Sequence, residues 1–339
     1  MDMLELCTEL DISGMAKSRG VDLYTTLSVY NLHHWFDGYR AVVVLDLYDP
    51  AIAIVDIGGR AVIASSRCSN VDTYIARLVR ALGLEEDLTE FHSIALRDVL
   101  LSSFVRMWSG WRLRSCDLWW ALVVGVCQQN ASFRQGWSML LNIVNLYGRR
   151  VRVEGFGEVV LPPRPEDIVR DPSKLSIARV GYRARAIESI ARSFLEKLVP
   201  PSEALERMDS HEVEDVLRSL RGVGSYTARL AMVLALRRYE LPPVDRWLRA
   251  IVSRVYGVDE RYAERKWVEI WGRWSGLAAI ALTIALDAAP LRDALSRIER
   301  GELVPKLGNE PSPATLWRFT QLTTARTSRA YRQRISPTS

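Results

Sequence analysis

The sequence predicts an α+β protein in which a small N-terminal domain with an antiparallel β-sheet precedes a larger all-α region. Three observations predict this class. Residues 41–65 contain β-branched runs separated by Asp-Pro and Gly-Gly turns. After Asn70, apolar residues recur at steps of three and four, as in amphipathic helices. The chain has 339 residues, 48% of them hydrophobic, which is enough for two or three domains with cores.

The predicted strands are short and closely spaced. The runs AVVVLDLY, AIAIVDI and AVIAS begin at residues 41, 51 and 61. The first helical pattern, VDTYIARLVRALG, begins at Val71 and ends at a glycine, which is typical of a helix C-terminus. The proline-rich stretch VLPPRPED at residues 160–167 predicts a loop between helices. Further helical patterns lie at about residues 87–109, 117–148, 182–197, 211–220, 225–238, 246–256, 261–272 and 276–298.

These patterns divide the chain into three parts. We expect an N-terminal α+β domain at residues 1–100, an all-α core at residues 101–300 and a polar, basic tail at residues 301–339. Two interpretations of the tail stay open. It is either a disordered segment that adds non-specific affinity for DNA or a strap that crosses the body of the protein.

The charge of the chain is carried mainly by arginine. Of its 45 basic residues 40 are Arg and five are Lys, and the net charge is +5. Arginine binds phosphate with a planar fork, although a GC-rich genome would also favour its codons. Asn and Gln together number only eleven, which suggests a thermophilic source. No apolar run is long enough to span a membrane and the N-terminus lacks a secretory pattern, so we expect a cytoplasmic protein.

The cysteines give no metal-binding pattern. Cys7, Cys68, Cys116 and Cys127 lie far apart and form no Cys-x-x-Cys pair, so we expect buried free thiols. The neighbouring histidines at 33–34 have no Cys or carboxylate at ligand spacing, and we interpret them as structural.

The stretch LRGVGSYTA at residues 220–228 predicts a tight hairpin between two helices. Glycine tolerates the positive φ that so short a turn needs. The N–H groups of Gly222, Gly224 and the start of the next helix would point outward together and could bind a phosphate without reading sequence. The alternative is a plain corner between two helices.

Asp245 follows two prolines and begins another amphipathic helix in YELPPVDRWLRAIVSRVYG. Taken alone, this residue is most simply a helix N-cap. Taken together, LxGVGxxTA and the PVD at residues 243–245 resemble the helix-hairpin-helix and Gly/Pro-Asp signature of the endonuclease III superfamily of DNA glycosylases.

Three further segments are similar to the group of 3-methyladenine DNA glycosylase II and 8-oxoguanine DNA glycosylase, in which a strand-rich N-terminal domain is also found. They are VGVCQQNASFRQGWSML at 124–140, RVGYRARAIESIARSF at 179–194 and WSGLAAIALTIALDAA at 274–289. The resemblance covers about residues 20–298. It implies that residues 101–300 form two helical lobes with the DNA cleft between them.

The resemblance also implies a reaction. A glycosylase flips a damaged base out of the duplex and breaks its N-glycosidic bond through an oxocarbenium-like sugar. Asp245 is the expected catalytic carboxylate, which would stabilise this charge and orient water, and its helix N-terminus would hold it ionised. The other implied site residues are the phosphate-binding hairpin Gly222, Val223, Gly224, Ser225 and Thr227, the base-pocket residues Tyr226 and Trp274, and the duplex wedge Gln129 with Gln128 and Asn130.

Tyr226 limits the expected chemistry. Members of the family that also cut the strand carry a lysine at this position, two residues after the second hairpin glycine, where it forms a Schiff base. Here the position is Tyr, and no lysine lies between residues 198 and 265. We therefore expect a monofunctional glycosylase that leaves an abasic site, acting on alkylated purines that stack on the pocket rings.

Two other functions stay open at this point. The same fold could excise 8-oxoguanine, or thymine or uracil opposite guanine. A protein of another class, a DNA damage-binding module, could use the hairpin without catalysis, although it would have no need of a carboxylate beside the sugar.

The resemblance implies no required cofactor. The family's iron–sulfur cluster needs four Cys near the C-terminus, whereas the last Cys here is Cys127, so we expect no cluster. A Na⁺ or K⁺ could be bound by the carbonyl groups of Arg218, Leu220 and Gly222. The expected partner is double-stranded DNA that contains a damaged base. We expect a monomer, associated with the nucleoid in a prokaryotic cytoplasm, and no membrane partner.

Overall fold

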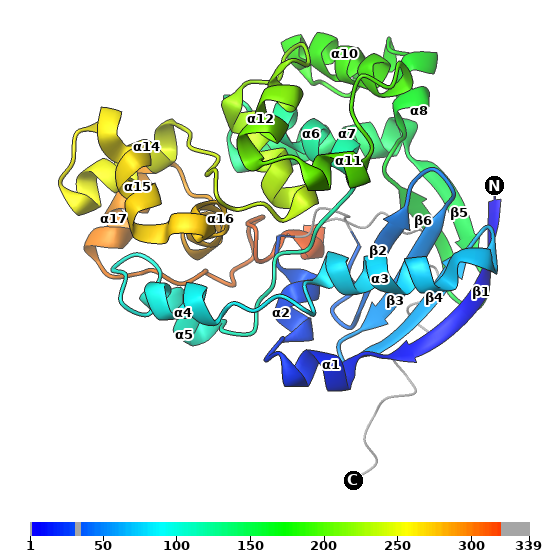
Figure 1. The fold of residues 1–339 in the computed structure, drawn as a ribbon, viewed down its shortest axis with the longest axis horizontal. Coiled ribbons are helices and arrows are strands. Elements are labelled where there is room, and N and C mark those ends of the chain that lie inside the picture. The colour runs from blue at the N-terminus through cyan, green and yellow to red at the C-terminus, as the bar shows by residue number, and fades with distance from the viewer. Residues whose placement is uncertain (1, 31–34, 320–339) are drawn as a thin grey trace.

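A six-stranded sheet forms one side of the molecule (Figure 1). The computed structural model describes residues 2–30 and 35–319, so His33 and His34 lie outside the described residues. The strand order is β2-β3-β4-β1-β5-β6. The strands are β1 (Asp2–Asp11), β2 (Arg40–Asp46), β3 (Ala51–Asp56), β4 (Arg60–Ser65), β5 (Arg149–Val153) and β6 (Gly157–Leu161).

The sheet confirms the α+β class but is not wholly antiparallel. Strands β2, β3, β4 and β1 pair antiparallel, whereas Asp2–Leu4 of β1 pairs parallel with β5. The hairpin β5–β6 comes from the middle of the chain and joins the N-terminal sheet. The sequence pattern that indicates strand β5 is the alternation of buried Val151 and Val153 with exposed Arg150 and Arg152, which has the period of a strand.

The prediction of a loop over residues 160–167 is wrong at both ends. Val160 and Leu161 belong to β6, and helix α8 begins at Pro165. Proline is well suited to the first position of a helix, because it lacks the N–H that would have no partner there. The predicted loop therefore shortens to residues 162–164.

The remaining described chain is mainly helical. No helix among the described residues is long and apolar enough to cross a membrane. The first helices are α1 (Ser13–Ser18), α2 (Leu23–Ser28), α3 (Val71–Leu82), α4 (Thr89–Ala95), α5 (Ser102–Met107), α6 (Leu118–Gln128), α7 (Phe133–Tyr147), α8 (Pro165–Arg170) and α9 (Lys174–Ile177). The later helices are α10 (Ala184–Leu195), α11 (Ser202–Arg207), α12 (Ser210–Arg218), α13 (Ser225–Ala231), α14 (Arg246–Tyr256), α15 (Ala263–Trp271), α16 (Ser275–Ala285) and α17 (Leu291–Glu299).

The helices form two groups beside the sheet (Figure 1). Helices α6, α7 and α10–α13 form one lobe, and helices α14–α17 form the other. Helix α6 is apolar on every side and its Trp119 and Trp120 are fully buried. Such a helix needs partners all round, and α6 provides the centre of the first lobe. The boundaries expected at residues 100 and 300 stay a prediction.

The sheet is covered on both faces. Helix α3 packs Leu78 and Leu82 against Val43, Ala53 and Ile63 on one face. On the other face, residues such as Ile52 join the core of the helical region. Successive side chains of a strand point to opposite faces of the sheet. Because both faces are buried here, β2, β3 and β4 contain nearly continuous apolar runs.

The prediction of free thiols is wrong for one pair of cysteines. Cys7 of β1 and Cys68 form a disulfide with their Cα atoms 5.1 Å apart, within the usual range. Cys116 and Cys127 are free and buried, as expected. The pair was not predicted because β1 was not predicted, and only the pairing of β1 with β4 brings Cys7 close to the residues that follow β4.

The segment after α17 is a strap across the two parts of the protein. The Tyr30 N–H donates a hydrogen bond to the Pro313 carbonyl at 2.7 Å. Thr315 and Leu316 are buried, and the Trp317 ring packs edge-on against Phe36 with the ring centroids 5.1 Å apart. Of the two interpretations of the tail, the strap therefore holds up to residue 319, and residues 320–339 lie outside the described residues.

Candidate active site

The hairpin between α12 and α13 has the geometry that its glycines predict. Gly222 has a φ of +89°, and a Cβ there would lie 2.4 Å from the Cβ of Ala186 in α10. Only glycine satisfies both the backbone conformation and the close approach. Gly224 has no such constraint, because a Cβ there would meet open space, and this residue is exposed.

The five hairpin residues expected to bind phosphate do not all reach the surface. Gly222 and Gly224 are exposed and Ser225 is half-buried, whereas Val223 and Thr227 are buried. The first N–H groups of α13 have no partner within their own helix and can donate hydrogen bonds to an anion. The Val223 N–H already donates to the Leu220 carbonyl at 3.1 Å.

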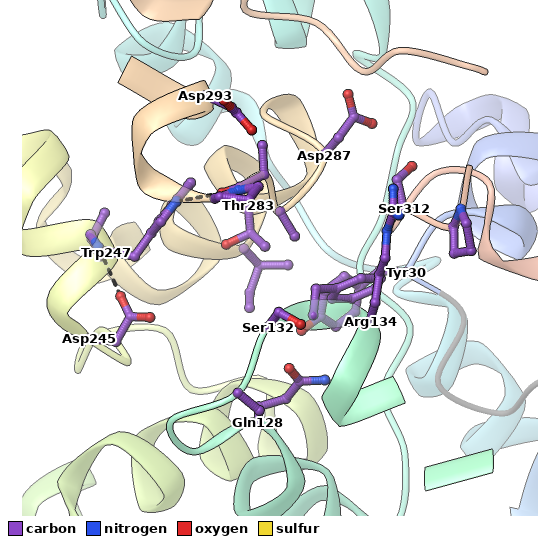
Figure 2. Close-up of a pocket in the computed structure, with 18 of the residues that line it drawn as sticks. Tyr30, Gln128, Ser132, Arg134, Asp245, Trp247, Thr283, Asp287, Asp293 and Ser312 are labelled. Atoms are coloured by element: carbon purple, nitrogen blue, oxygen red, sulfur yellow. Dashed lines mark hydrogen bonds between the residues drawn. The ribbon is translucent and has the colours of Figure 1, made fainter. Parts of the chain in front are cut away.

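Asp245 caps helix α14 and borders a large cavity. Its Oδ1 accepts a hydrogen bond from the Leu248 N–H at 2.8 Å, as expected of an N-cap. The turn before it is tight, since the Val244 N–H donates to the Pro242 carbonyl at 2.9 Å. Figure 2 shows the Asp245 carboxylate at the edge of the cavity, close to Trp247.

The surroundings of Asp245 raise its pKa above the ordinary 3.8. The largest cause is the partial removal of the carboxylate from water. Backbone N–H groups at the start of α14 and the positive charge of Arg249 act in the opposite direction. The helix N-terminus therefore favours the ionised form, as expected, but does not lower the pKa overall. A carboxylate with a raised pKa is a stronger base towards water.

The cavity measures about 970 Å³ and lies between the two helical lobes and the strap (Figure 2). Its walls come from the loop before α7, from α13, α14 and the end of α16, and from the strap. Several aromatic side chains line it: Tyr30, Phe133, Tyr226 and Trp247. A cavity with aromatic walls and a carboxylate at its edge can hold a planar ring next to a reacting bond.

The structure brings Tyr226 and Asp245 together at the cavity. Both line the cavity, and burial together with the negative charge of Asp245 raises the pKa of the Tyr226 hydroxyl well above its usual value. The phenol therefore keeps its proton and can donate a hydrogen bond towards the cavity. Tyr226 has no amine and cannot form a Schiff base.

Trp274 does not line this cavity. It is 7% exposed, its Nε1 donates to Glu90 at 3.0 Å, and its ring lies 6.0 Å from that of Tyr239. Trp247, which follows Asp245 by two residues, is the tryptophan that lines the cavity, and its Nε1 donates to the Ala289 carbonyl at 2.9 Å. Trp247 is not among the pocket residues that the resemblance implies.

The three residues expected to form the duplex wedge have different surroundings. The Nε2 of Gln129 donates to Thr227 Oγ1 at 2.6 Å and to the Gly222 carbonyl at 3.2 Å, so its side chain is bound to the hairpin. Gln128 lines the cavity. Asn130 is exposed with a φ of +46°, a conformation that asparagine tolerates better than most residues. Arg183 holds this loop through the carbonyl groups of Val126 and Gln129.

The carbonyl groups of Arg218, Leu220 and Gly222 lie at the end of α12, where the helix dipole favours a cation. Leu220 accepts the Val223 N–H and Gly222 accepts the Gln129 amide. A carbonyl oxygen has two lone pairs, so each can still bind a hard monovalent ion. Neutral carbonyl oxygens are donors of the kind that Na⁺ or K⁺ takes, and the binding of either ion here stays a prediction. Among the described residues, no group of three His, Cys, Asp or Glu could hold a metal ion.

Comparisons with known proteins point to DNA glycosylases. No family model matches the sequence. The chain is 31% identical over 86 residues to DNA-3-methyladenine glycosylase 1 of Schizosaccharomyces pombe, covering 24% of this chain and 37% of that protein. It is 29% identical over 164 residues to DNA-3-methyladenine glycosylase of Bacillus subtilis, covering 48% and 54%. It is 28% identical over 123 residues to a protein of Methanothermobacter thermautotrophicus named "Probable N-glycosylase/DNA lyase", covering 36% and 38%. The chain thus spans between about a third and just over half of the length of these curated relatives.

Solved structures are similar over most of the chain. The 8-oxoguanine glycosylase/lyase of Clostridium acetobutylicum in its apo-form matches with a TM-score of 0.63 and 18% identity, covering 83% of this chain and 98% of that one. The 3-methyladenine DNA-glycosylase of Archaeoglobus fulgidus matches with a TM-score of 0.61 and 20% identity, covering 78% and 93%. At these identities the likeness shows the fold, which is that of the helix-hairpin-helix DNA glycosylases.

Proposed function

We propose that this protein is a DNA glycosylase of base excision repair, whose partner is double-stranded DNA with a damaged base. The observation that carries the proposal is the position of Asp245. It lies at the N-terminus of α14, at the edge of an aromatic cavity and opposite Tyr226 of the hairpin helix. A phosphate held at the hairpin would bring the sugar of a flipped nucleotide between these two helices.

In this proposal each element has a defined task. The flipped base enters the cavity and stacks on its aromatic walls. As the bond to the sugar breaks, the ionised Asp245 stabilises the positive charge that develops on the sugar and orients the attacking water. The Tyr226 hydroxyl keeps its proton and can donate a hydrogen bond to the base or to the water. A Na⁺ or K⁺ on the carbonyls of Arg218, Leu220 and Gly222 would hold the hairpin in shape.

We further propose that the reaction stops at the abasic site. The support is Tyr226, which stands where a strand-cutting lysine would be. Lys306 lines the cavity at its strap side, but its ammonium lies 3.2 Å from Glu302. This ion pair with Glu302 would have to break before the amine could attack a sugar.

The proposed substrates are alkylated purines. The support is the set of four cavity rings, which suits an electron-poor base, and the names of the relatives from Schizosaccharomyces pombe and Bacillus subtilis. The alternatives are 8-oxoguanine, and thymine or uracil opposite guanine, on the same fold.

A panel of lesion duplexes tests these proposals. Each duplex is incubated with the protein and analysed with and without hot alkali. We expect breaks only after alkali, and first on the duplexes with alkylated purines. Breaks without alkali would overturn the monofunctional proposal, and a Lys306→Ala variant would then show whether Lys306 is the amine. Binding of lesion duplexes without base release from any of them would favour the damage-binding module instead.

A further inference from the structure

An ion-pair network of Arg229, Glu214, Glu264 and Arg249 joins four helices of the two lobes; we call it the Arg229 network. Arg229 of α13 donates from Nε to Glu214 of α12 at 2.9 Å and from Nη1 to Glu264 of α15 at 2.6 Å. The side chains of Arg229 and Glu214 are only 16% and 5% exposed. This central pair is held in one geometry because its charges have few other partners, whereas Glu264 and Arg249 are 34% and 40% exposed.

Arg229 also reaches the turn that precedes Asp245. Its Nη1 lies 3.5 Å from the Pro242 carbonyl oxygen. The same carbonyl accepts the Val244 N–H at 2.9 Å, the bond that closes the turn. One side chain of the hairpin helix therefore contacts the backbone three residues before the proposed catalytic carboxylate.

A second connection runs through Glu264. Its other carboxylate oxygen lies 3.5 Å from Nη2 of Arg249, one helical turn after Asp245 in α14. The positive charge of Arg249 acts to lower the pKa of Asp245. The network thus touches the chain on both sides of Asp245, at the turn before it and at the helix after it.

We propose that Arg229 is a positioning residue that fixes the place of Asp245 relative to the phosphate-binding hairpin. The inference rests on the proposed glycosylase function, in which the hairpin holds the phosphate and Asp245 meets the sugar of the same nucleotide. A displacement of about 1 Å between such groups can lower a rate by about a hundredfold. Arg229 is suited to the task because its planar group binds two carboxylates and a carbonyl at once.

Three variants separate positioning from stability. Arg229→Met keeps the length of the side chain and removes every contact of the guanidinium. Glu264→Gln weakens the connection to Arg249 and leaves Glu214 paired. The matched control is Glu86→Gln, which removes the buried ion pair between Glu86 and Arg237 (2.7 Å) away from the cavity.

The first readout is the single-turnover rate of base release at a temperature well below every variant's Tm. We expect the rate to fall about tenfold or more in Arg229→Met and several-fold in Glu264→Gln, and to stay within about twofold in Glu86→Gln. Affinity for a duplex with a tetrahydrofuran abasic analogue should stay within about threefold in all of them, because the hairpin is intact. Equal losses of rate in Arg229→Met and Glu86→Gln would show that Arg229 contributes only to stability.

The second readout is the acid limb of the pH–rate profile. Arg229→Met removes a positive charge, so the pKa of Asp245 should rise and the limb should move to higher pH. Glu264→Gln removes a negative charge beside Arg249, so the limb should move to lower pH. Tyr226, which faces Asp245 from α13, stays protonated and adds no charge. Limbs that do not move in either variant would show that the network does not act on Asp245 and would overturn the proposal.

The third readout does not depend on activity. Amide hydrogen exchange of residues 244–248, which follow the two prolines of the turn, should be faster in Arg229→Met than in Glu86→Gln, because the turn and the cap at Leu248 lose their support. Unchanged exchange there would overturn the positioning role. A wild-type protein that releases no base from any duplex would contradict the proposed function, while the exchange measurement would still decide whether Arg229 positions Asp245.

Discussion

Gln129 and Thr227 are joined by a hydrogen bond of 2.6 Å that ties the loop before α7 to the hairpin helix. The neighbouring Asn130 is exposed at the tip of the same loop. Under the proposed function, this arrangement separates a residue that holds the hairpin and the loop together from an exposed one that would enter the duplex.

The first prediction concerns these two neighbours. Asn130→Ala should slow base release and flipping, because nothing then fills the gap left by the flipped nucleotide. Gln129→Ala should weaken binding to every duplex several-fold, because the Gly222 carbonyl and Thr227 lose their partner. Fluorescence of 2-aminopurine next to the lesion measures flipping, and titration measures affinity. If Gln129→Ala blocks flipping and Asn130→Ala does not, Gln129 is the wedge.

The second prediction concerns Asp245. Asp245→Asn should lower the rate of base release by about a hundredfold or more, because the developing charge on the sugar loses its counter-ion. Asn keeps the cap on Leu248, so DNA binding should persist. Burial raises the pKa of Asp245, so the ionised carboxylate is destabilising at neutral pH, and the Tm of the variant should equal or exceed that of the wild type. Base release at an unchanged rate would remove Asp245 from the mechanism.

The third prediction follows from the same pKa. Base release needs the ionised carboxylate, and the pKa of Asp245 is raised above 3.8 by burial. The single-turnover rate should therefore fall on acidification, at pH values above those at which an exposed aspartate titrates. Circular dichroism at each pH controls for unfolding. A rate that stays constant down to about pH 4 would contradict this assignment.

The fourth prediction compares the two hairpin glycines. Gly222→Ala should lower both Tm and DNA affinity, because a left-handed backbone conformation costs about 1–2 kcal/mol for alanine and its Cβ would overlap Ala186. Gly224→Ala should leave the Tm nearly unchanged, since its Cβ meets open space. Gly224→Asp should keep the fold and weaken binding at every sequence, by repelling the phosphate. Equal effects of the two alanine variants on Tm would contradict the geometry of the turn.

The fifth prediction concerns the disulfide between Cys7 and Cys68. The two cysteines lie 61 positions apart in the sequence, so the bond restricts the unfolded chain and should contribute about 2–4 kcal/mol to stability. Cys7→Ser, or a reductant on the wild type, should lower the Tm by similar amounts. The control variant is Cys116→Ser, which replaces a cysteine that forms no disulfide. A Tm that does not respond to reductant would show that the bond does not form under those conditions.

The parts of the site that could be predicted are those whose functional residues lie close together in the sequence. Gly222, Gly224 and Tyr226 lie within five residues, and Asp245 starts the next predicted helix. Spacing along the chain is then a good guide to spacing in the structure. The strands β2, β3 and β4 were predicted for the same reason, since short turns join them.

The parts that could not be predicted depend on contacts between distant segments. Strand β1 gives only a weak alternation, and it is set in the sheet by pairing with β4 and β5, which lie far along the chain. The choice between Trp247 and Trp274 depends on how α14 and the turn before α16 pack. Eleven tryptophans offer too many candidates for a choice by sequence alone.

The strap has a consequence for how substrate preference can change. One wall of the cavity carries Tyr30 from near the start of the chain, and another carries Ser312 from beyond the last α-helix. The residues proposed for chemistry, Tyr226 and Asp245, lie in between. Natural selection can therefore remodel the shape of the cavity through the two ends of the chain and leave the centre untouched. Under the proposed function, substitutions at Tyr30 or Ser312 would change the preferred lesion and leave the hairpin and its aspartate unchanged.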